Sequence, residues 1–567
     1  MRIRLCNLNA LIALLLVSWI KSPAQVKQKA AAPRPNIIVI LADDLGFSDI
    51  GAYGSEIHTP NLDYLAGHGT RYTQFYNTSR CCPTRASLLT GLYNHQAGIG
   101  NMTDAEDAPG YQGYITQNTV TLAEVLKSAG YNTGMTGKWH VSNTNGQKSP
   151  EEQLQWLNHQ KDFGNFSPLD QYPTSRGFDK YFGNIWGVVD FFDPFSLVNG
   201  TKPVKKVPAD YYHTDAINDT AVAYIRNFAK DTKPFFLYVA QTAPHWPLMA
   251  KPKDIAKYEE TYKAGWDVIR RERYRRMSKS GIIDTAQTPL PKRWKDDLSW
   301  ADNPDKDWDA RAMAVHAAMI DCMDQGIGRI IDALRATKEL DNTLIIFLSD
   351  NGASPENCTA YGPGFDRPNQ TRDGRPIAYD MKKQILPGNE LSYASIGPRW
   401  ANVANTPFQF WKAESYEGGV HTPMIAFWPK GIHTKGGGIN RVTVGHVMDL
   451  MPTFVELSGA KYPTTFRGNK VFPTTGLSMV PSFRGSKSTG HSMLFNEHFG
   501  ARYARSGDWK VVAKGDDRHW QLFNLAQDRT ETKDLAADFP EVVKQLDSLW
   551  NKWANTHQVF PKPKKAR

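Results

Sequence analysis

Cysteine is scarce in this sequence. The chain has 567 residues and 5 cysteines. Cys6 lies in the N-terminal segment described below, so the rest of the chain contains only Cys81, Cys82, Cys322 and Cys358. So few cysteines exclude a fold that depends on a disulfide framework. A single bridge is compatible with this number, and the sequence does not indicate which pair would form it.

Long apolar runs are also missing, apart from one at the N-terminus. Arg2 and Arg4 precede an apolar segment at 8–20, and small residues follow at 22–24. This order predicts a signal peptide at residues 1–24 and an exported protein, either periplasmic or secreted. The alternative is a membrane anchor, for which the apolar run is short. Because no later segment is comparably long and apolar, we predict no membrane span in the mature protein.

Internal repeats, low-complexity segments and motifs of nucleic-acid-binding proteins are not found either. The formal net charge is +10, and part of it lies in the C-terminal tail at 562–567. A basic balance attracts anionic substrates, although a basic tail is more often a solvated surface. Without a binding motif, nucleic acid is not an expected partner.

What the sequence does contain is a series of short apolar runs separated by helical patterns. Continuous apolar runs are typical of strands buried on both faces of a sheet. Their alternation with helical patterns predicts an α/β fold with a large, mostly parallel sheet flanked by helices. The apolar runs lie at 35–41, 234–240, 343–350 and 423–428, and the helical patterns at 121–129, 215–229, 312–336 and 445–457.

The character of the sequence changes near residue 485. Segments at 506–513 and 519–525 have the pattern of short antiparallel strands, and a helical pattern at 541–553 follows. We therefore predict two domains. The main domain spans 34–484 and contains an insertion at about 250–310, a segment that is polar, basic and interrupted by proline. The smaller C-terminal α+β domain spans 485–567 and contains an antiparallel sheet and the basic tail.

The stretch CCPTRASLLTG, from Cys81 to Gly91, is the most informative part of the chain. Pro83 suits the first position of a helix and Gly91 suits its end. Both cysteines then lie at the helix N-terminus, where backbone N–H groups and the helix dipole favour an anion. If the helix extends back to Cys81, Arg85 lies on the same face. The cysteine pair has three other interpretations: half of a disulfide scaffold, part of a metal site, or two buried small residues.

Carboxylates follow two of the predicted strands, at the sheet edge where open α/β proteins bind ligands. Asp43 and Asp44 follow the first run, and Asp350 and Asn351 stand at the end of another. An oxygen-only set suits Ca²⁺ or Mg²⁺ better than zinc. Adjacent residues of a strand point in opposite directions, so both aspartates can share an ion only where the chain leaves strand geometry, which Gly46 would allow. Capping and turn roles are the alternative.

Lysine and histidine side chains occur near the other predicted strand ends. Lys138 and His140 would share one face of an extended chain and would pair a cation with a general base. His245 follows the run at 234–240, and Lys412 precedes the last run. For any one of these residues alone, a structural role is the better expectation. Two further histidines neighbour these motifs and are not excluded by local spacing, His95 and His421.

These motifs occur together, in the same order, in one known family. The chain resembles the type I sulfatases of the alkaline-phosphatase superfamily over most of residues 34–460, and among them it is most similar to the bacterial arylsulfatases. The resemblance implies an alkaline-phosphatase-like fold, a catalytic domain at 34–484, and hydrolysis of sulfate esters to an alcohol or phenol and inorganic sulfate. The matching motifs are LADDLG (41–46), CCPTRASLLTG (81–91), TGKWH (136–140), APH (243–245), SDNG (349–352) and Lys412 before EGG (417–419).

The resemblance also implies a modified residue and a metal ion. A formylglycine-generating enzyme reads Cys-x-Pro-x-Arg and would oxidise Cys81, which fits that frame, to Cα-formylglycine; Cys82 does not fit. Thr84 stands where serine is commoner. The hydrated aldehyde, a gem-diol, would attack sulfur. Its oxygen would bind one Ca²⁺, or Mg²⁺, together with Asp43, Asp44, Asp350 and Asn351.

The remaining residues of these motifs receive roles from the same resemblance. Lys138, Lys412 and Arg85 would neutralise the sulfate oxygens. His245 would protonate the leaving alkoxide, and His140 would take the proton of the second hydroxyl and so expel sulfate.

Three other functions compete with sulfate ester hydrolysis. A phosphonate or phosphate ester hydrolase of the same superfamily can use the same aldehyde and metal. A non-catalytic protein that binds sulfated glycans through Lys138, Lys412 and Arg85 is a second alternative, and the complete set of catalytic motifs argues against it. A structural protein with a disulfide at Cys81 or Cys82 ranks last. Aryl, carbohydrate and steroid sulfates present the same head group, so the motifs leave the substrate class open.

Overall fold

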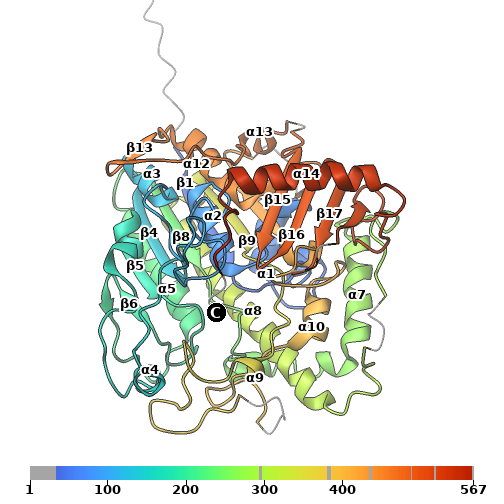
Figure 1. Ribbon diagram of the computed structural model, residues 1–567. Helices are drawn as coiled ribbons and strands as arrows, with labels where there is room; N and C mark the ends of the chain where they lie inside the picture. Colours follow the sequence, from blue (N-terminus) through green and yellow to red (C-terminus); the bar gives the residue numbers. More distant parts are fainter. Residues whose placement is uncertain are drawn as a thin grey trace, which may run out of the picture. The chain divides into compact units, whose positions relative to one another are not determined.

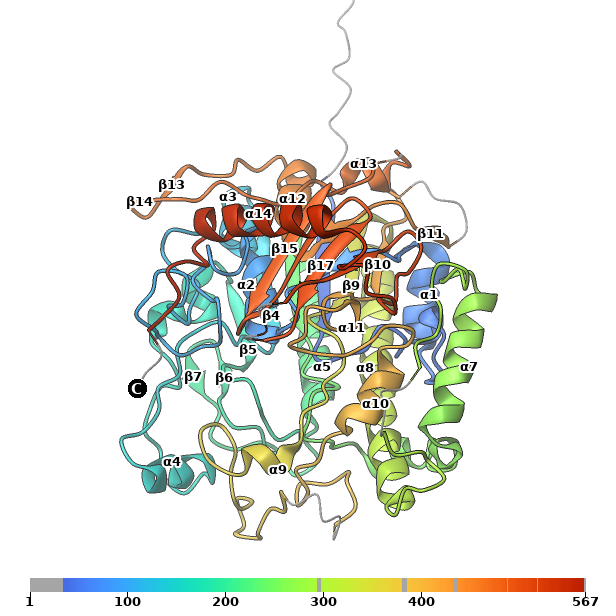
Figure 2. The same ribbon diagram turned by 45° about the vertical axis from the view of Figure 1, so that its right-hand side comes forward.

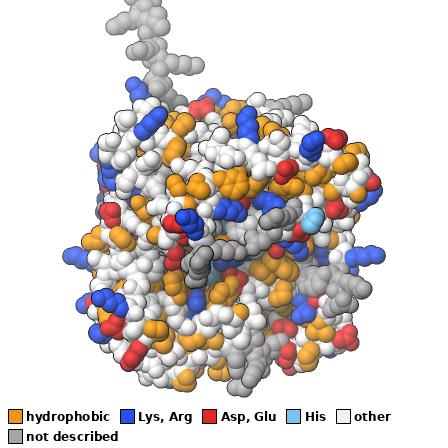
Figure 3. Space-filling view, viewed as in Figure 1, with side chains coloured by type: hydrophobic (Ala, Val, Ile, Leu, Met, Phe, Trp, Pro, Cys, Tyr) orange, Lys and Arg blue, Asp and Glu red, His pale blue; other side chains and the backbone are white. Residues whose placement is uncertain are grey.

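The structure is a computed structural model that describes residues 34–292, 297–379, 385–432, 437–486, 488–515, 517 and 519–564. The predicted signal peptide at 1–24 and the last residues of the basic tail lie outside this part of the chain. Within it, no helix combines the length and the apolar character needed to cross a membrane. Figure 3 shows Lys and Arg side chains scattered among acidic ones on the face in view, without one large basic patch.

A ten-stranded sheet forms the centre of the fold (Figures 1 and 2). In spatial order its strands are β11 (Gly438–Asn440), β2 (Thr70–Tyr72), β10 (Met424–Phe427), β9 (Thr343–Ser349), β1 (Asn36–Ala42), β8 (Phe235–Ala240), β4 (Asn132–Gly137), β5 (Lys180–Asn184), β6 (Leu197–Asn199) and β7 (Lys202–Pro203). The five strands from β9 to β5 are parallel. The predicted α/β fold with a large, mostly parallel sheet is therefore confirmed.

Two layers of helices cover the sheet because its strands bury side chains on both faces. Ile38 and Ile40 of β1 belong to one core, and Ile37, Val39 and Leu41 to the other. The first core includes helices α1 (Pro60–His68), α5 (His213–Phe228), α6 (Pro252–Ile255), α7 (Trp266–Lys279), α8 (Lys306–Ala336), α9 (Cys358–Tyr361) and α10 (Gly397–Ala404). The second includes α2 (Cys81–Thr90), α3 (Leu122–Ser128), α4 (Pro150–Leu157), α12 (Leu450–Ser458) and α13 (Val480–Phe483).

Some elements differ from their predicted form. The run at 423–428 forms β10, which is antiparallel to β9, because a continuous apolar run carries no sign of strand direction. Helix α12 begins at Leu450 rather than at 445. The preceding residues pair with β3 (Phe75–Tyr76) as β12 (Gly445–His446), and the His446 ring accepts a hydrogen bond from the backbone N–H of Met448.

A four-stranded antiparallel sheet lies near the C-terminus, as predicted. Its strands are β15 (Met493–His498), β16 (Ala501–Ser506), β17 (Trp509–Ala513) and β18 (Gln521–Asn524). Helix α14 (Pro540–Thr556) runs across it (Figure 1) and packs through Leu546, Trp550 and Trp553. The chain from Pro35 onward forms one compact unit. The domain boundary near 485 stays a prediction.

A buried lysine joins this sheet to the main sheet's loops. Lys510 Nζ on β17 lies 2.8 Å from Oε1 of Glu417, at the start of α11 (Glu417–Val420), and 2.8 Å from Oε1 of Glu531. Glu417 also binds His421, whose Nδ1 lies 3.0 Å from Oε2. His421 thus has a structural partner.

The predicted insertion at 250–310 is packed against the rest of the fold. Its helix α7 carries Arg273, which is fully buried and lies 2.6 Å from Asp49 and 2.7 Å from Glu56. Asp49 in turn accepts the backbone N–H of Gly46, at the edge of the sheet. This helix therefore supports the loop that follows β1. The assignment of 250–310 as an insertion remains a prediction.

His95 also has a structural partner, and that ion pair gives a test of the fold. Glu497 on β15 accepts a hydrogen bond from His95 Nε2 at 2.9 Å and lies 2.9 Å from Lys562. Burial by itself would raise the pKa of Glu497, but His95 and Lys562 outweigh it and hold the pKa at about 2 instead of 4.5. This difference corresponds to about 3 kcal/mol of stability.

We therefore expect the wild type to lose this stabilisation as the pH falls from about 4.5 towards 2, because a carboxylate with a depressed pKa stabilises only while it is ionised. Glu497→Gln should be less stable near neutral pH, and its deficit should shrink on acidification. Urea unfolding from about pH 6 to about pH 3 measures this. Glu541→Gln, at an exposed position on α14, is the control. A deficit that does not change with pH would contradict the ion pair.

Candidate active site

Asp43 and Asp350 lie side by side because they end neighbouring parallel strands. Ala42 of β1 pairs with Ser349 of β9, so the residues that follow meet at one edge of the sheet. The backbone N–H of Asp44 donates to Asp350 Oδ1 at 3.2 Å, and Asn351 Nδ2 donates to Asp44 Oδ1 at 2.6 Å. The four predicted oxygen ligands are therefore close together and buried.

The backbone leaves strand geometry at Asp44 itself. Its φ is 63°, in the left-handed region that asparagine and aspartate tolerate better than most residues. Gly46, which was expected to allow this bend, has another role. A Cβ at Gly46 would lie 2.4 Å from the backbone of Ala404, so glycine is needed there for close packing.

Two oxygens of this cluster are buried without a hydrogen-bond partner among the described residues, Asp43 Oδ1 and Asn351 Oδ1. Candidate ligand atoms of Asp43, Cys81 and Asp350 lie within 4.8 Å of one another. Burial and the neighbouring Asp43 raise the pKa of Asp350 well above its ordinary value. Orphaned oxygens and crowded carboxylates are the environment that a hard divalent cation would stabilise. The residues present therefore fit Ca²⁺ or Mg²⁺.

Cys81 is the first residue of α2, which begins two positions before Pro83 and not at it. Gly91 ends the helix with φ 72°, as predicted. The helix includes both Cys81 and Arg85, which places them on one face. A hydrogen bond from Cys82 and the charges of Lys412 and Lys138 lower the pKa of the Cys81 thiol well below its ordinary value, although burial opposes them. Position 81 thus favours an anionic atom.

Two buried lysines converge on the aspartates from opposite sides. Lys138 Nζ lies 2.6 Å from Asp43 Oδ2, and Lys412 Nζ lies 2.9 Å from Asp44 Oδ2. Lys412 Nζ is also 3.3 Å from His245 Nε2. The charges of both ammonium groups also act on Cys81. The site can therefore hold an anion next to position 81.

The Arg85 side chain binds carboxylates of the cluster. Its Nη2 lies 2.7 Å from Asp350 Oδ2 and 3.5 Å from Asp43 Oδ1, and its Nη1 donates to the Lys138 carbonyl oxygen at 3.1 Å. The side chain is fully buried. The guanidinium is thus aligned with two acids of the cluster, and its expected contact with sulfate oxygens stays a prediction.

His140 comes to the site through a turn and not through extended chain. Strand β4 ends at Gly137, and His140 has φ 54°, so the expected sharing of a strand face with Lys138 is wrong. Burial and the charge of Lys138 lower the pKa of His140 to about 4, and the ring is hydrogen-bonded to Cys81. A neutral imidazole beside position 81 is suited to accept a proton.

His245 faces the opposite side of the cluster. Its Nδ1 donates to the Trp246 carbonyl oxygen at 2.5 Å, which leaves Nε2 directed at Lys412 and at Asp44 Oδ2, 3.5 Å away. The two histidines therefore reach the cluster from different segments of the chain, His140 beside Cys81 and His245 beside Lys412.

Two charged residues of the site were not identified from the sequence. Glu356 lies 3.2 Å from Lys412 and 2.9 Å from Arg80, and it accepts a hydrogen bond from Trp246 Nε1 at 2.7 Å. Arg80 could have been noticed as the neighbour of Cys81. Glu356 has no local pattern that marks it, since its role depends on the fold of the loop after Asp350.

The four cysteines of the described chain are all free and buried. No disulfide therefore competes for Cys81 or Cys82 in this structure. Cys82 contacts Met102, with 3.9 Å between the two sulfur atoms, and burial raises its pKa well above the ordinary value. The pKa of the Cys81 thiol is thus lowered, whereas that of the neighbouring Cys82 thiol is raised.

Comparisons with known proteins agree with this geometry. The Sulfatase family model matches residues 35–460. The chain is 35% identical to the arylsulfatase of Klebsiella aerogenes, covering 79% of this chain and 92% of that protein. It is 33% identical to an uncharacterized sulfatase of Schizosaccharomyces pombe, with 92% and 94% covered. The crystal structure of Ps i-CgsB matches with a TM-score of 0.62 at 25% identity, covering 92% of this chain and 93% of that one. The chain therefore belongs to the type I sulfatase family, and it is a sulfuric ester hydrolase.

Proposed function

We propose that this sulfatase uses a formylglycine at position 81 and one divalent cation, Ca²⁺ or Mg²⁺, to release sulfate from its ester. The observation that carries the proposal is a pair of buried oxygens without a hydrogen-bond partner among the described residues, Asp43 Oδ1 and Asn351 Oδ1, in the cluster that brings Asp43 and Asp350 to Cys81. Asp43, Asp44, Asp350 and Asn351 would hold the cation, which would supply positive charge where the nucleophile forms. The hydrated aldehyde would supply a nucleophilic hydroxyl and a second hydroxyl for the release of sulfate.

The other residues of the site would bind the substrate and move protons. Lys138 and Lys412 would bind the sulfate oxygens and stabilise the charge that builds up on them. His245 Nε2 would donate a proton to the oxygen of the leaving alcohol. His140, neutral because of its low pKa, would accept the proton of the second hydroxyl. Arg85 would hold Asp350 and Asp43 in place.

We also propose that the protein is exported and that a formylglycine-generating enzyme modifies it before use. The basic and apolar pattern of residues 1–24 supports the first proposal. The Cys81-x-Pro83-x-Arg85 frame supports the second. Two proteins of the same fold are known with sugars bound: Ps i-CgsB with k-i-k-neocarrahexaose, and another with D-glucosamine-2-N,6-O-disulfate. A sulfated sugar is therefore a substrate class to test here.

The alternative of a phosphate or phosphonate ester hydrolase is separated by kinetics on matched substrates. We expect kcat/KM for nitrophenyl sulfate to exceed that for nitrophenyl phosphate by at least about tenfold, since the lysines and the cation would be arranged around a sulfate monoanion. The measurement follows nitrophenol release by one preparation on both esters. A preference for the phosphate ester, with sulfate release at background, would overturn the proposal.

A further inference from the structure

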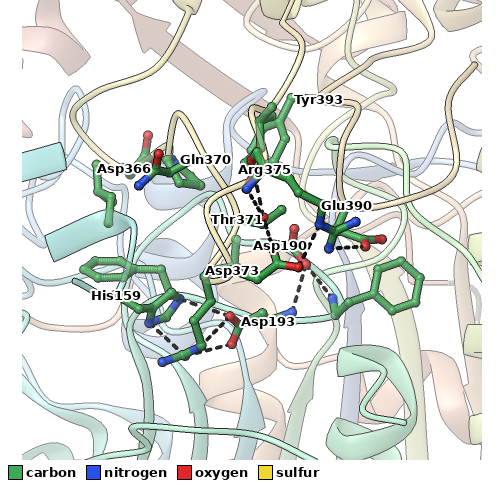
Figure 4. Close-up of a pocket in the computed structure, with 17 residues that line it drawn as sticks. His159, Asp190, Asp193, Asp366, Gln370, Thr371, Asp373, Arg375, Glu390 and Tyr393 are labelled. Carbon is green, nitrogen blue, oxygen red and sulfur yellow. Dashed lines mark hydrogen bonds and ion pairs between the residues drawn. The ribbon is translucent and has the colours of Figure 1, made fainter. Parts of the chain in front are cut away.

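A cavity lies next to the candidate active site. It has a volume of about 300 Å³ and is lined by segments between 157 and 195 and between 366 and 393 (Figure 4). Gly187, in the first of these, packs so closely on His140 that a Cβ would lie 2.5 Å from the imidazole ring. The next residue, Val188, donates its backbone N–H to Asp366 of the cavity wall. One loop therefore borders both the site and the cavity, whose size is at the lower end of small-molecule pockets (about 300–1,000 Å³).

The arginines of this cavity are already paired with acids. Arg372 lies 2.9 Å from Asp193, and Arg375 lies 2.8 Å from Asp373 and 2.9 Å from Glu390. Figure 4 shows these pairs around the cavity. Because each guanidinium has a carboxylate partner, neither is available to a second sulfate or carboxylate group of a ligand without loss of that pair.

Asp190 and Tyr393 have unused hydrogen-bonding capacity at the cavity wall. Asp190 is 7% exposed and has no cationic partner in the described chain; its Oδ1 accepts the backbone N–H groups of Phe192 and Asp193 at 2.6 and 2.8 Å. Tyr393 is 2% exposed, and its hydroxyl has no hydrogen-bond partner among the described residues. A buried hydroxyl without a partner is unfavourable, and a hydrogen bond to a ligand would remove that cost.

The protonation of Asp190 is compatible with a neutral ligand. Burial, and then the nearby carboxylates of Asp193 and Glu390, raise the pKa of Asp190 to about 7. Near neutral pH the carboxyl group can accept a hydrogen bond from a hydroxyl when ionised, or donate one when protonated. A second anionic group here would meet the carboxylate of Asp190, which has no cationic partner in the described chain, beside two ion pairs whose guanidinium groups are already bound. The aromatic rings of Phe192 and Phe195 line the same cavity and offer an apolar face to a ring.

We infer that this cavity holds the alcohol portion of the sulfate ester, and that this portion is a single hydroxyl-bearing ring without a second anionic group, as in a monosulfated sugar. The inference rests on the proposed function, because it assumes that the sulfate is bound between Lys138 and Lys412. Hydroxyl groups of the ring would pair with Tyr393 and Asp190. A disulfated sugar would place its extra charge beside Asp190, Asp193 and Glu390.

Three substrates test the inference: phenyl sulfate, a methyl hexoside monosulfate and the corresponding disulfate. For Tyr393→Phe, we expect the ratio of kcat/KM for the monosulfate to that for phenyl sulfate to fall about tenfold, the usual scale of one buried hydrogen bond. The variant should fold normally, since the hydroxyl has no partner to lose. The matched control is Tyr503→Phe on β16, outside the cavity lining, because its buried hydroxyl also has no hydrogen-bond partner among the described residues. It should leave the ratio unchanged.

Asp190→Asn tests the charge. The amide oxygen can still accept the N–H groups of Phe192 and Asp193, so the loop should keep its form. We expect the ratio of kcat/KM for the disulfate to that for the monosulfate to rise about tenfold. A wild type that hydrolyses the disulfate as well as the monosulfate, or a Tyr393→Phe variant with the wild-type ratio, would overturn the inference. If phenyl sulfate is hydrolysed in those cases, the proposed function stands; if no sulfate ester is hydrolysed, the proposed function itself fails.

Discussion

Replacing Cys81 by alanine is expected to abolish sulfate release while the protein stays folded. Removal of a covalent nucleophile costs an enzyme about 10⁴-fold or more in kcat. The side chain is small, and its loss should cost about 1 kcal/mol of stability, which is within the usual range for one substitution. Sulfate release and urea unfolding of the purified variant measure the two quantities separately.

Cys82→Ala is the matched control, because Cys82 is the neighbouring residue of the same helix but lies outside the Cys-x-Pro-x-Arg frame. It should remain active. Cys81→Ser should be inactive as well, since serine carries a single hydroxyl and its sulfate ester would have no internal route to release. Peptide mass measurement across 81–85 should find the aldehyde in active protein. An active protein with unmodified Cys81, or an active Cys81→Ser variant, would refute the mechanism.

Removal of the divalent cation is expected to reduce kcat by about 10³-fold and to lower the Tm by a few degrees. Without a cation, candidate ligand atoms of Asp43 and Asp350 lie within 4.8 Å of each other, and burial together with the charge of Asp43 raises the pKa of Asp350. A ligand that binds the folded state at a hundred times its Kd stabilises it by about 2.7 kcal/mol. Chelation, followed by addition of Ca²⁺ or Mg²⁺, should therefore move activity and Tm together.

The thermal measurement has its own control. Asp44→Asn removes one carboxylate ligand and the partner of Lys412, so its Tm should respond much less to Ca²⁺ than that of the wild type. The comparison is made by calorimetry on both proteins with and without the ion. If exhaustive chelation left both the activity and the Tm of the wild type unchanged, the oxygen cluster would not be a metal site.

The strands that carry the site could be predicted because each is a continuous apolar run ended by polar residues. The runs that became β1, β8 and β9 are buried along their whole length, and the apolar pattern alone indicates this. Asp43 and Asp350 could then be placed together, because the carboxyl ends of parallel strands meet at one edge. The direction of β10 could not be predicted, since its side chains are equally apolar in either orientation.

The electrostatic partners within the site could not be predicted, for a different reason. Glu356 acts on Lys412 and Arg80 through a loop whose path depends on packing, and the ion pair of Arg85 with Asp350 joins two segments far apart in the sequence. The cavity lined by Asp190 and Tyr393 is built from two segments about two hundred residues apart, neither of which carries a motif. Such sites depend on tertiary contacts that leave no local periodicity.

The burial of α2 has a consequence for the timing of maturation. In the folded protein Cys81 is 2% exposed and Arg85 is fully buried, so the segment between them is not accessible to a modifying enzyme. Lys412 is part of the completed site and follows Cys81 by 331 residues (412 − 81). At a synthesis rate of about 5–20 residues per second, that interval lasts roughly 20 to 70 s. The proposed oxidation of Cys81 would therefore have to precede complete folding.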